Sequence, residues 1–309
     1  MAFLDTYRQQ VTLLIRTIPF VAKETAFALK GGTAINLFVR DMPRLSVDID
    51  LTYLPVEDRT TSLAAIDAAM LRIAERIEAG IPGAKVNPSR SADEKIVTKL
   101  IVRAGGVQIK IEITPVLRGT VYDPVVTPVV PAVEDEFGFA EMQVVSFADL
   151  YAGKIVAALD RQHPRDLFDV RDLLAHEVLE TNSGAHSLSI SSATIARWPK
   201  SWHRYESHWQ RNSRGFVGMT QEPVALVDLE VAREAIIAAM IVEMPDAHRH
   251  FLVGFKRGEP DWELLGIQEA QRLPAVLWKQ RNLDRLPAGK RRELADRLAA
   301  MLHISHHLT

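Results

Sequence analysis

The 309-residue sequence contains no cysteine and no long uninterrupted apolar run. The absence of cysteine excludes disulfide bonds and thiolate sites for zinc or iron–sulfur clusters, and it is typical of a reducing compartment. No stretch approaches the roughly 18 apolar residues of a membrane span, so we expect no membrane partner. Asp5 and Arg8 lie where a signal peptide needs an uncharged core, which predicts a cytoplasmic protein.

An excess of charge of one sign is also lacking, because 37 basic and 39 acidic residues give a net charge of −2. This balance argues against a generally basic surface, so any nucleic-acid contact is expected to be local. Tryptophan is absent before Trp198 and histidine before His163, so the composition changes along the chain. The length suggests one large or two moderate domains.

The first part of the chain has the periodicity of a mixed α/β structure. Amphipathic helices are expected over 7–18 and 57–79, and short strands over 27–29 and 46–51. Two alternating segments, 95–103 and 107–114, flank a Gly-Gly pair and predict a hairpin. Thr33 is expected to cap a helix after the glycine turn, and the proline-rich residues 115–131 cannot form a regular helix.

The second part is mostly helical in pattern. Its helices are expected over 146–159, 164–176, 222–243, 268–281 and 288–302, with a linker that starts near Thr181 and no strand after it. The sequence therefore predicts an α+β fold, in which a small mixed sheet flanked by helices precedes a helical C-terminal region. The domain boundary is placed between residues 180 and 181.

The segment from Lys30 to Leu51 carries the clearest chemical signal. It consists of a strand, a glycine turn, a helix, and a second strand that contains Asp48 and Asp50. Residues two apart on a strand point to the same face, and paired aspartates with phosphate oxygens are ligands that magnesium prefers. A glycine turn at a helix N-terminus exposes N–H groups that bind anions. Together these features predict phosphoryl or nucleotidyl transfer; the alternative is an exposed strand with incidental acids.

Two segments also resemble known signatures. The GG turn followed by alternating aspartates resembles nucleotidyltransferases related to DNA polymerase beta, and LKGGTAINLF…RLSVDIDL more closely resembles the AbiEii/AbiGii toxin family of type IV toxin–antitoxin and abortive-infection (phage-defence) systems. The run DLYAGKIVAALDRQHPRDLFDV, from Asp149, resembles the second signature of that family, a lysine followed by RDxxD. In one departure from the general superfamily pattern, fifteen residues separate Gly32 from Asp48, slightly more than the commonest spacing.

The resemblance implies a polymerase-beta-like nucleotidyltransferase domain at residues 1–180 and a helical domain at 181–309. It further implies magnesium-dependent transfer of a nucleoside monophosphate from a nucleoside triphosphate (NTP) to an acceptor hydroxyl. In some relatives that acceptor is tRNA, at its 3′ end, and the partner is a cognate antitoxin. The alternatives are nucleotidylation of a protein side chain or a small molecule, or a nucleotide-binding module without turnover.

The resemblance also assigns the site residues. The active-site set comprises Ser46, Asp48, Lys154 and Asp166, with Asp50 as the second metal carboxylate. The nucleotide-binding set comprises Gly31, Gly32, Thr33, Ser46, Arg165 and Asp169. From the residues alone, Lys154 either binds an anion or extends its ammonium from an apolar helix to water. Asp166 and Asp169 share a helix face, where they orient Lys154, bind nucleotide, or cap the helix start.

Glu112 is the third acid of interest, on the second strand of the predicted hairpin. Polymerase-beta-like folds place a carboxylate on the adjacent strand as a metal ligand or base. Lys110 shares its strand face, so simple cross-strand charge support is the competing interpretation.

Three C-terminal clusters have a functional and a plain interpretation. The basic and aromatic stretch 196–214 suits either stacking on unpaired nucleotides or a helix in the core. Lys290-Arg291-Arg292, with Arg281 and Arg285, suits either an RNA backbone or a solvated helix. The histidines near the C-terminus, His303, His306 and His307, are discounted as a metal site because they lie at a chain end.

Overall fold

The computed structural model of the chain describes residues 4–176, 216 and 218–302. Two compact units divide these residues. The first extends to Leu150 and resumes with the described residues up to Ala225, whereas the second begins at Tyr151 and resumes at Leu226. The predicted boundary between residues 180 and 181 lies outside the described residues.

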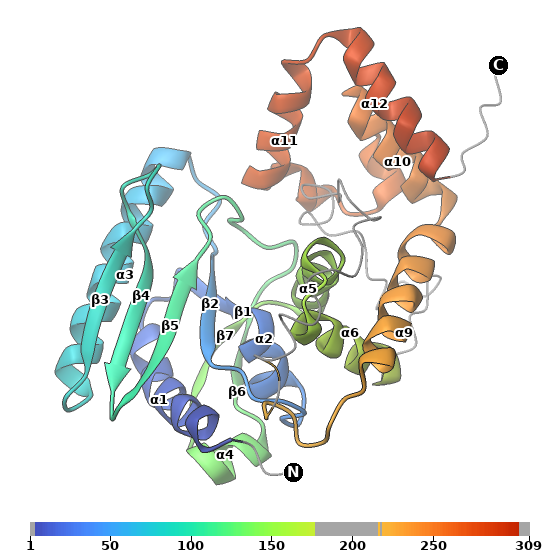
Figure 1. The fold of residues 1–309 in the computed structure, drawn as a ribbon. Coiled ribbons are helices and arrows are strands. Elements are labelled where there is room, and N and C mark those ends of the chain that lie inside the picture. Colours follow the sequence, from blue (N-terminus) through green and yellow to red (C-terminus); the bar gives the residue numbers. More distant parts are fainter. Residues whose placement is uncertain (1–3, 177–215, 217, 303–309) are drawn as a thin grey trace. The chain divides into compact units, whose positions relative to one another are not determined.

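A seven-stranded mixed sheet forms the centre of the first unit, with the order β3-β4-β5-β2-β1-β7-β6 (Figure 1). Its strands are β1 (Phe27–Lys30), β2 (Asp48–Tyr53), β3 (Lys85–Arg90), β4 (Val97–Ala104), β5 (Val107–Ile113), β6 (Val125–Pro128) and β7 (Glu141–Val144). The pairs β1/β7 and β2/β5 are parallel and the others are antiparallel. The sheet is larger than predicted, because the sequence patterns indicated neither β3, β6 nor β7.

The helices of this unit are α1 (Asp5–Val21), α2 (Gly31–Ala34), η1 (Ile35–Val39), α3 (Arg59–Gly80) and α4 (Pro131–Phe137). The predicted apolar stripe of α1, which includes Val11, Leu14 and Ile18, is completely buried. Helix α1 packs against β5 and β7, and α3 packs against β3 and β4. The predicted amphipathic helices thus cover the sheet as their periodicity requires.

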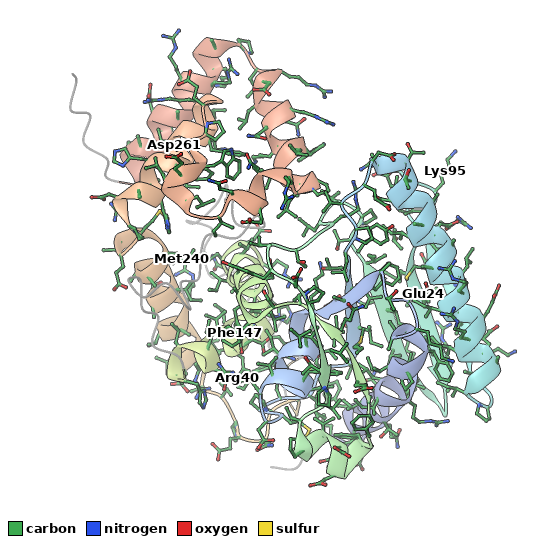
Figure 2. All side chains as sticks on the ribbon, turned by 180° about the vertical axis from the view of Figure 1, so that it is seen from behind. Glu24, Arg40, Lys95, Phe147, Met240 and Asp261 are labelled. Atoms are coloured by element: carbon green, nitrogen blue, oxygen red, sulfur yellow. The ribbon has the colours of Figure 1, made fainter. Side chains whose placement is uncertain are left out.

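A buried carboxylate joins α3 to the segment that follows α1. Glu24 is 7% exposed and accepts hydrogen bonds from Arg72 and Arg76 of α3, at 2.7 and 2.6 Å for the closest contacts (Figure 2). The hydrogen bond from Arg72 is the main cause of the lowered pKa of Glu24, and that from Arg76 acts in the same direction against the opposing effect of burial. The two arginines therefore hold Glu24 in its charged form.

The predicted hairpin is confirmed, since Gly105 and Gly106 connect β4 to β5 with φ of +57° and +80°. Two successive positive φ values suit glycine, which lacks the Cβ that makes this conformation costly. The predicted cap at Thr33 is wrong, because the helix already begins at Gly31 and Lys30 occupies the cap position. The Thr33 hydroxyl instead lies 2.5 Å from the carbonyl oxygen of Asp48, a contact between α2 and β2.

The second unit is helical throughout its described part. Its helices are the main length of α5 (Phe147–Arg161), then α6 (Pro164–His176), α9 (Leu226–Ile237), η2 (Ala238–Val242), α10 (Asp246–Arg257), η3 (Trp262–Leu265), η4 (Gln268–Arg272), α11 (Pro274–Asp284) and α12 (Ala288–Met301). Helix α6 packs against α9, and α10 packs against α12 and η3. The aromatic rings of Phe251, Phe255 and Trp262 form one cluster, with centroids 5.0 to 6.2 Å apart.

One predicted helix of this unit is divided. The continuous helix expected over 268–281 is instead η4 followed by α11, with extended backbone at Leu273. Pro274 has no N–H to donate to the preceding turn, and proline favours the first position of a helix. The sequence pattern was therefore correct in period and wrong in continuity. None of the helices in the described ranges combines the length and apolar character of a membrane span.

Candidate active site

Three of the predicted acids lie on one face of the first unit's sheet. Asp48 and Asp50 occupy alternate positions of β2, and the intervening Ile49 is completely buried. Strand β5 runs parallel to β2, with Glu112 in register with Asp50 and Lys110 in register with Asp48. Because residues in register point to the same side, the fold brings Asp48, Asp50 and Glu112 together.

Two lysines neutralise part of this carboxylate cluster. The Nζ atom of Lys110 lies 2.8 Å from Glu112 Oε2 and 3.7 Å from Asp48 Oδ2, and Nζ of Lys99 lies 2.7 Å from Glu112 Oε1. Partial burial opposes the charge of Lys110 and of Glu112, but their mutual hydrogen bond outweighs it, raising the pKa of Lys110 and lowering that of Glu112. The predicted cross-strand pair of Lys110 and Glu112 is confirmed.

The glycine turn closely approaches this cluster. Gly31 has a φ of +76°, and a Cβ atom on it would lie 2.6 Å from Oδ2 of Asp50. A Cβ atom on Gly32 would lie 2.6 Å from Nη2 of Arg44 and 3.0 Å from Oγ of Ser46. Both positions therefore require glycine, the first for its backbone conformation as well as for space.

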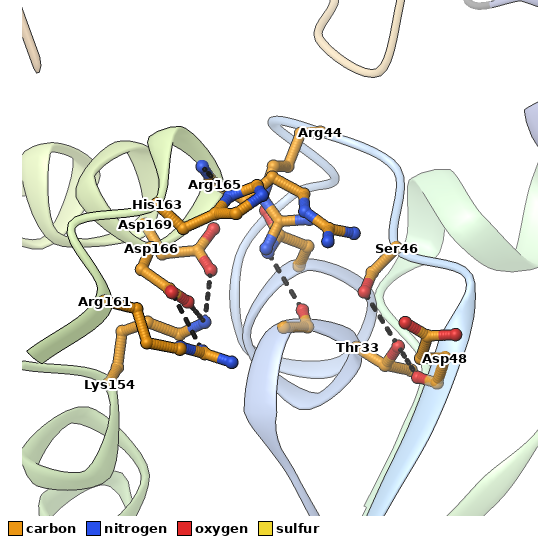
Figure 3. A network of polar contacts seen from close by, with 12 residues as sticks. Thr33, Arg44, Ser46, Asp48, Lys154, Arg161, His163, Arg165, Asp166 and Asp169 are labelled. Carbon is orange, nitrogen blue, oxygen red and sulfur yellow. Dashed lines mark hydrogen bonds and ion pairs between the residues drawn. The ribbon is translucent and has the colours of Figure 1, made fainter. Parts of the chain in front are cut away.

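Short polar side chains connect the turn to strand β2 (Figure 3). The Thr33 hydroxyl donates a hydrogen bond toward Ser46 Oγ, 3.0 Å away, or the closer Asp48 carbonyl oxygen. The amide of Asn36 donates to the carbonyl oxygen of Gly32 at 2.9 Å. The predicted nucleotide-binding residues of this unit thus form one connected network beside the two aspartates.

Arg44 belongs to this network although the sequence analysis missed it. It is 2% exposed, its Nη1 donates to the carbonyl oxygen of Leu45, and its backbone pairs with Thr220. Its position two residues before Ser46 was the available signal, but a loop arginine is usually exposed. The described chain after the gap thereby supports the Ser46 loop through Arg44.

The acids of the first unit fit a magnesium ion by the chemistry of their oxygen donors. Within the described ranges, no group of three His, Cys, Asp or Glu side chains has the arrangement of a metal site. Magnesium is commonly held by one or two carboxylates together with substrate phosphates and water, so Asp48 and Asp50 are sufficient. Glu112 stays a predicted third ligand, and in this structure two lysines engage it.

The second unit contains a buried lysine between two aspartates. Nζ of Lys154 on α5 lies 3.0 Å from Oδ1 of Asp166 and 2.9 Å from Oδ2 of Asp169, and all three side chains are at most 7% exposed (Figure 3). Arg161 completes the cluster with Nη2 2.8 Å from Oδ2 of Asp166. Helix α6 begins at Pro164, which places the two aspartates one turn apart.

These contacts narrow the interpretations left open by the sequence. The buried ammonium of Lys154 does not extend to water, and both aspartates are aimed at it, which is the geometry of residues that orient a lysine. Arg165 is half-buried, and its backbone N–H donates to Nδ1 of His163 at 3.2 Å. The stretch 196–214 and the C-terminal histidines lie outside the described residues.

A comparison with protein-family models now identifies the family. The model for the nucleotidyl transferase AbiEii toxin of type IV toxin–antitoxin systems matches residues 12–279. The chain belongs to this family. The family resemblance found in the sequence is thereby confirmed, and it implies an NTP substrate and an antitoxin partner.

A solved structure supports the fold. MenT4, a nucleotidyltransferase toxin from Mycobacterium tuberculosis H37Rv, is similar with a TM-score of 0.51 and 17% sequence identity, over 95% of this chain and 92% of that chain. At this identity the similarity concerns the fold alone. It confirms the predicted α+β fold with a nucleotidyltransferase-type sheet and a helical C-terminal region. No curated protein sequence matches the chain.

Proposed function

We propose that this AbiEii-family chain transfers a nucleoside monophosphate from an NTP to an acceptor hydroxyl, with magnesium. The observation that carries the proposal is the placement of Asp48 and Asp50 on one sheet face, against the glycine turn at Gly31. A carboxylate pair beside backbone N–H groups suits a metal-bound triphosphate, because transfer of a phosphoryl group depends mainly on positioning and electrostatics.

The residues of the first unit have distinct roles in this proposal. Asp48 and Asp50 hold magnesium, and Glu112 is the third carboxylate on the adjacent strand. Bound magnesium neutralises the phosphate oxygens and the charge that develops on them. Thr33 and Arg44 hold the Ser46 loop in place, so that the Ser46 hydroxyl and the N–H groups of the glycine turn bind phosphate oxygens.

The residues of the second unit supply positive charge in a fixed orientation. Asp166 and Asp169 position Lys154, which stabilises the negative charge of the transferred group. Arg165, next to this cluster, contacts the nucleotide. Such positioning has a physical basis in the burial of all three members of the cluster, which leaves the lysine few alternative rotamers.

The acceptor in this proposal is the 3′ end of tRNA, and the protein acts in the cytoplasm. The family description as a toxin supports an acceptor whose modification stops growth. We assign acceptor recognition to the predicted domain at residues 181–309, because the nucleotide-site residues end at Asp169 whereas unpaired basic side chains gather on α11 and α12.

One labelling experiment tests the reaction. The protein is incubated with each of four labelled NTPs, magnesium and total cellular RNA, and the products are separated by size. We expect label in a tRNA band, its loss with Asp48→Asn, and no change with Asp123→Asn, an exposed aspartate of the same unit. Label in a protein or small-molecule fraction would change the acceptor, whereas triphosphate binding without any labelled product would contradict the transfer itself.

A further inference from the structure

The end of the second unit that carries α11 and α12 is strongly basic. Seven residues from Arg272 to Arg292 are basic and a single one, Asp284, is acidic, although the whole chain has a net charge of −2. Long side chains project outward from these two helices (Figure 2). Such a local excess in a balanced chain is the pattern expected of a site for a polyanion.

Local ion pairs account for two of these charges. Lys290 is paired with Glu293, 2.7 Å away, and Arg291 is paired with Asp284, 3.4 Å away. Arg291 also lies against Gly258, where an added Cβ would be 2.9 Å from its Nη1 atom. Arg291 therefore supports the fold, and it is a poor choice for testing a surface role.

Three other arginines are exposed and form no ion pair with any residue of the described chain: Arg281, Arg285 and Arg292. The ion pair between Arg291 and Asp284 ties the first turn of α12 to the last turn of α11. Arg292 is consequently held at the same end of the unit as Arg285. The unpaired charges form one surface on two connected helices.

An exposed tryptophan lies among these arginines. Trp278 is 57% exposed, and its spacing to Arg281 and Arg285 places all three on one side of α11. The opposite side of the helix is anchored in the unit by Val276 and Leu283, which are at most 4% exposed. Packing inside the unit therefore does not explain why an indole stands at this position.

We infer that this surface, the Trp278 face (Trp278, Arg281, Arg285 and Arg292), binds an unpaired stretch of the acceptor RNA. The indole stacks on a base, and the guanidinium groups bind the flanking phosphates in the two-pronged geometry that arginine favours. An acidic protein would also attract the arginines, but the exposed aromatic ring beside them favours nucleic acid. The inference rests on the proposed function, because it names where the RNA acceptor is held.

The test measures RNA binding by the full-length protein without any NTP. A short unstructured RNA with a fluorescent label is titrated, and its anisotropy gives the dissociation constant. Trp278→Ala should weaken binding about tenfold, as expected for the loss of one stacked base, while Trp278→Phe should retain most of the affinity. Replacing the neighbouring exposed Leu277 by alanine should leave the affinity unchanged, because Leu277 points to a different side of α11.

The arginines are tested through salt dependence. The double variant Arg281→Glu, Arg285→Glu should lower the slope of log K against log salt by about 2, one per lost phosphate contact. Arg103→Glu, an exposed arginine of the first unit without an ion pair to a described residue, is the matched charge control. It should leave the slope at the parental value.

The outcomes separate this inference from the proposed function. Parental RNA affinity in both Trp278→Ala and the arginine variant would overturn the Trp278 face, whatever the transfer assay gives. A loss of affinity for polyglutamate equal to the loss for RNA, with Trp278→Ala without effect, would instead indicate an acidic protein and would also overturn it. RNA binding that depends on Trp278, in a protein that transfers nothing to RNA, would support the face and contradict the proposed reaction.

Discussion

The two units each contain a lysine held between carboxylates, but the two lysines differ in exposure. Lys110 and its partners Asp48 and Glu112 on the sheet have side chains about one-third exposed. Lys154 and its partners Asp166 and Asp169 are at most 7% exposed. The same residue types at similar distances thus form an accessible cluster in one unit and a closed one in the other.

This difference separates a cluster that can exchange partners from one that cannot. Water screens the ion pairs of the accessible cluster, so a metal ion or phosphate can replace one of its contacts at little cost. Breaking the closed cluster strands a charge inside the protein, which is strongly unfavourable. We therefore expect substitutions at the accessible cluster to change binding and chemistry, and substitutions at the closed cluster to change stability as well.

The largest expected effect comes from removing the buried lysine. Lys154→Met should lower the free energy of unfolding by about 3–5 kcal/mol, because it leaves Asp166 and Asp169 buried without their cation. Lys110→Met is the matched control, and it should change that free energy by about 1 kcal/mol or less. Both values come from urea unfolding followed by circular dichroism. Equal losses for the two variants would abolish the distinction between the clusters.

The next effect is on the reaction. Asp48→Asn should slow nucleotidyl transfer by roughly a hundredfold to a thousandfold, since it removes the charge of a proposed metal ligand. Urea unfolding should be close to that of the parent, because Asp48 is partly exposed. Asp123→Asn controls for the loss of a surface charge. A parental transfer rate in Asp48→Asn would remove this residue from the proposed metal site.

Local patterns in the sequence predicted much of the fold and less of the site. Helix α6 and the β4–β5 hairpin depend on a proline start, a Gly-Gly turn and regular alternation, which are visible in a short window. Strands β3 and β6 escaped detection because they lie at the sheet edges, contain proline and carry mostly exposed residues. Strand β7 is short, and its parallel pairing with β1 joins residues far apart in the chain.

The site shows the same limit. Alternation predicted that Asp48 and Asp50 share a face, and helical spacing predicted the same for Asp166 and Asp169. Neither pattern determines which residue of another element comes into register, so the contact of Glu112 with Lys99 was not predicted. Thr33 is a similar case: its sequence position suggests a cap, but the approach of β2 offers its hydroxyl a different partner.

A smaller effect is expected from Gly31→Ala, which tests how the glycine turn supports the accessible cluster. The positive φ alone should cost about 1–2 kcal/mol, and the new methyl group would also displace the Asp50 carboxylate. Gly83→Ala has a similar φ of +74° with nothing within 4 Å, so it isolates the conformational cost. Transfer should fall in Gly31→Ala alone; equal activity in the two variants would exclude a role for the Asp50 contact.

The smallest expected effect concerns Glu24, whose burial lies close to that of the closed cluster while its arginine partners are exposed. Its side chain is 8% exposed, whereas Arg72 and Arg76 are 48% and 33% exposed. Glu24→Gln should therefore lower the free energy of unfolding at pH 7 by only about 1 kcal/mol, since water screens the two cations. Glu134→Gln, at an exposed carboxylate of α4, should have no measurable effect.

The pH dependence gives the sign of the Glu24 contribution. Hydrogen bonds from the arginines, first that from Arg72, lower its pKa from the ordinary value of 4.5, so the unfolded chain takes up this proton at a higher pH than the folded chain. The stabilisation is then complete above pH 4.5 and is lost as the pH falls through the lowered folded-state pKa. Urea unfolding at a series of pH values should show the parent and Glu24→Gln converging in acid. A constant difference down to the lowest pH would mean that Glu24 acts through packing, and that its exposed arginines do not stabilise its charge.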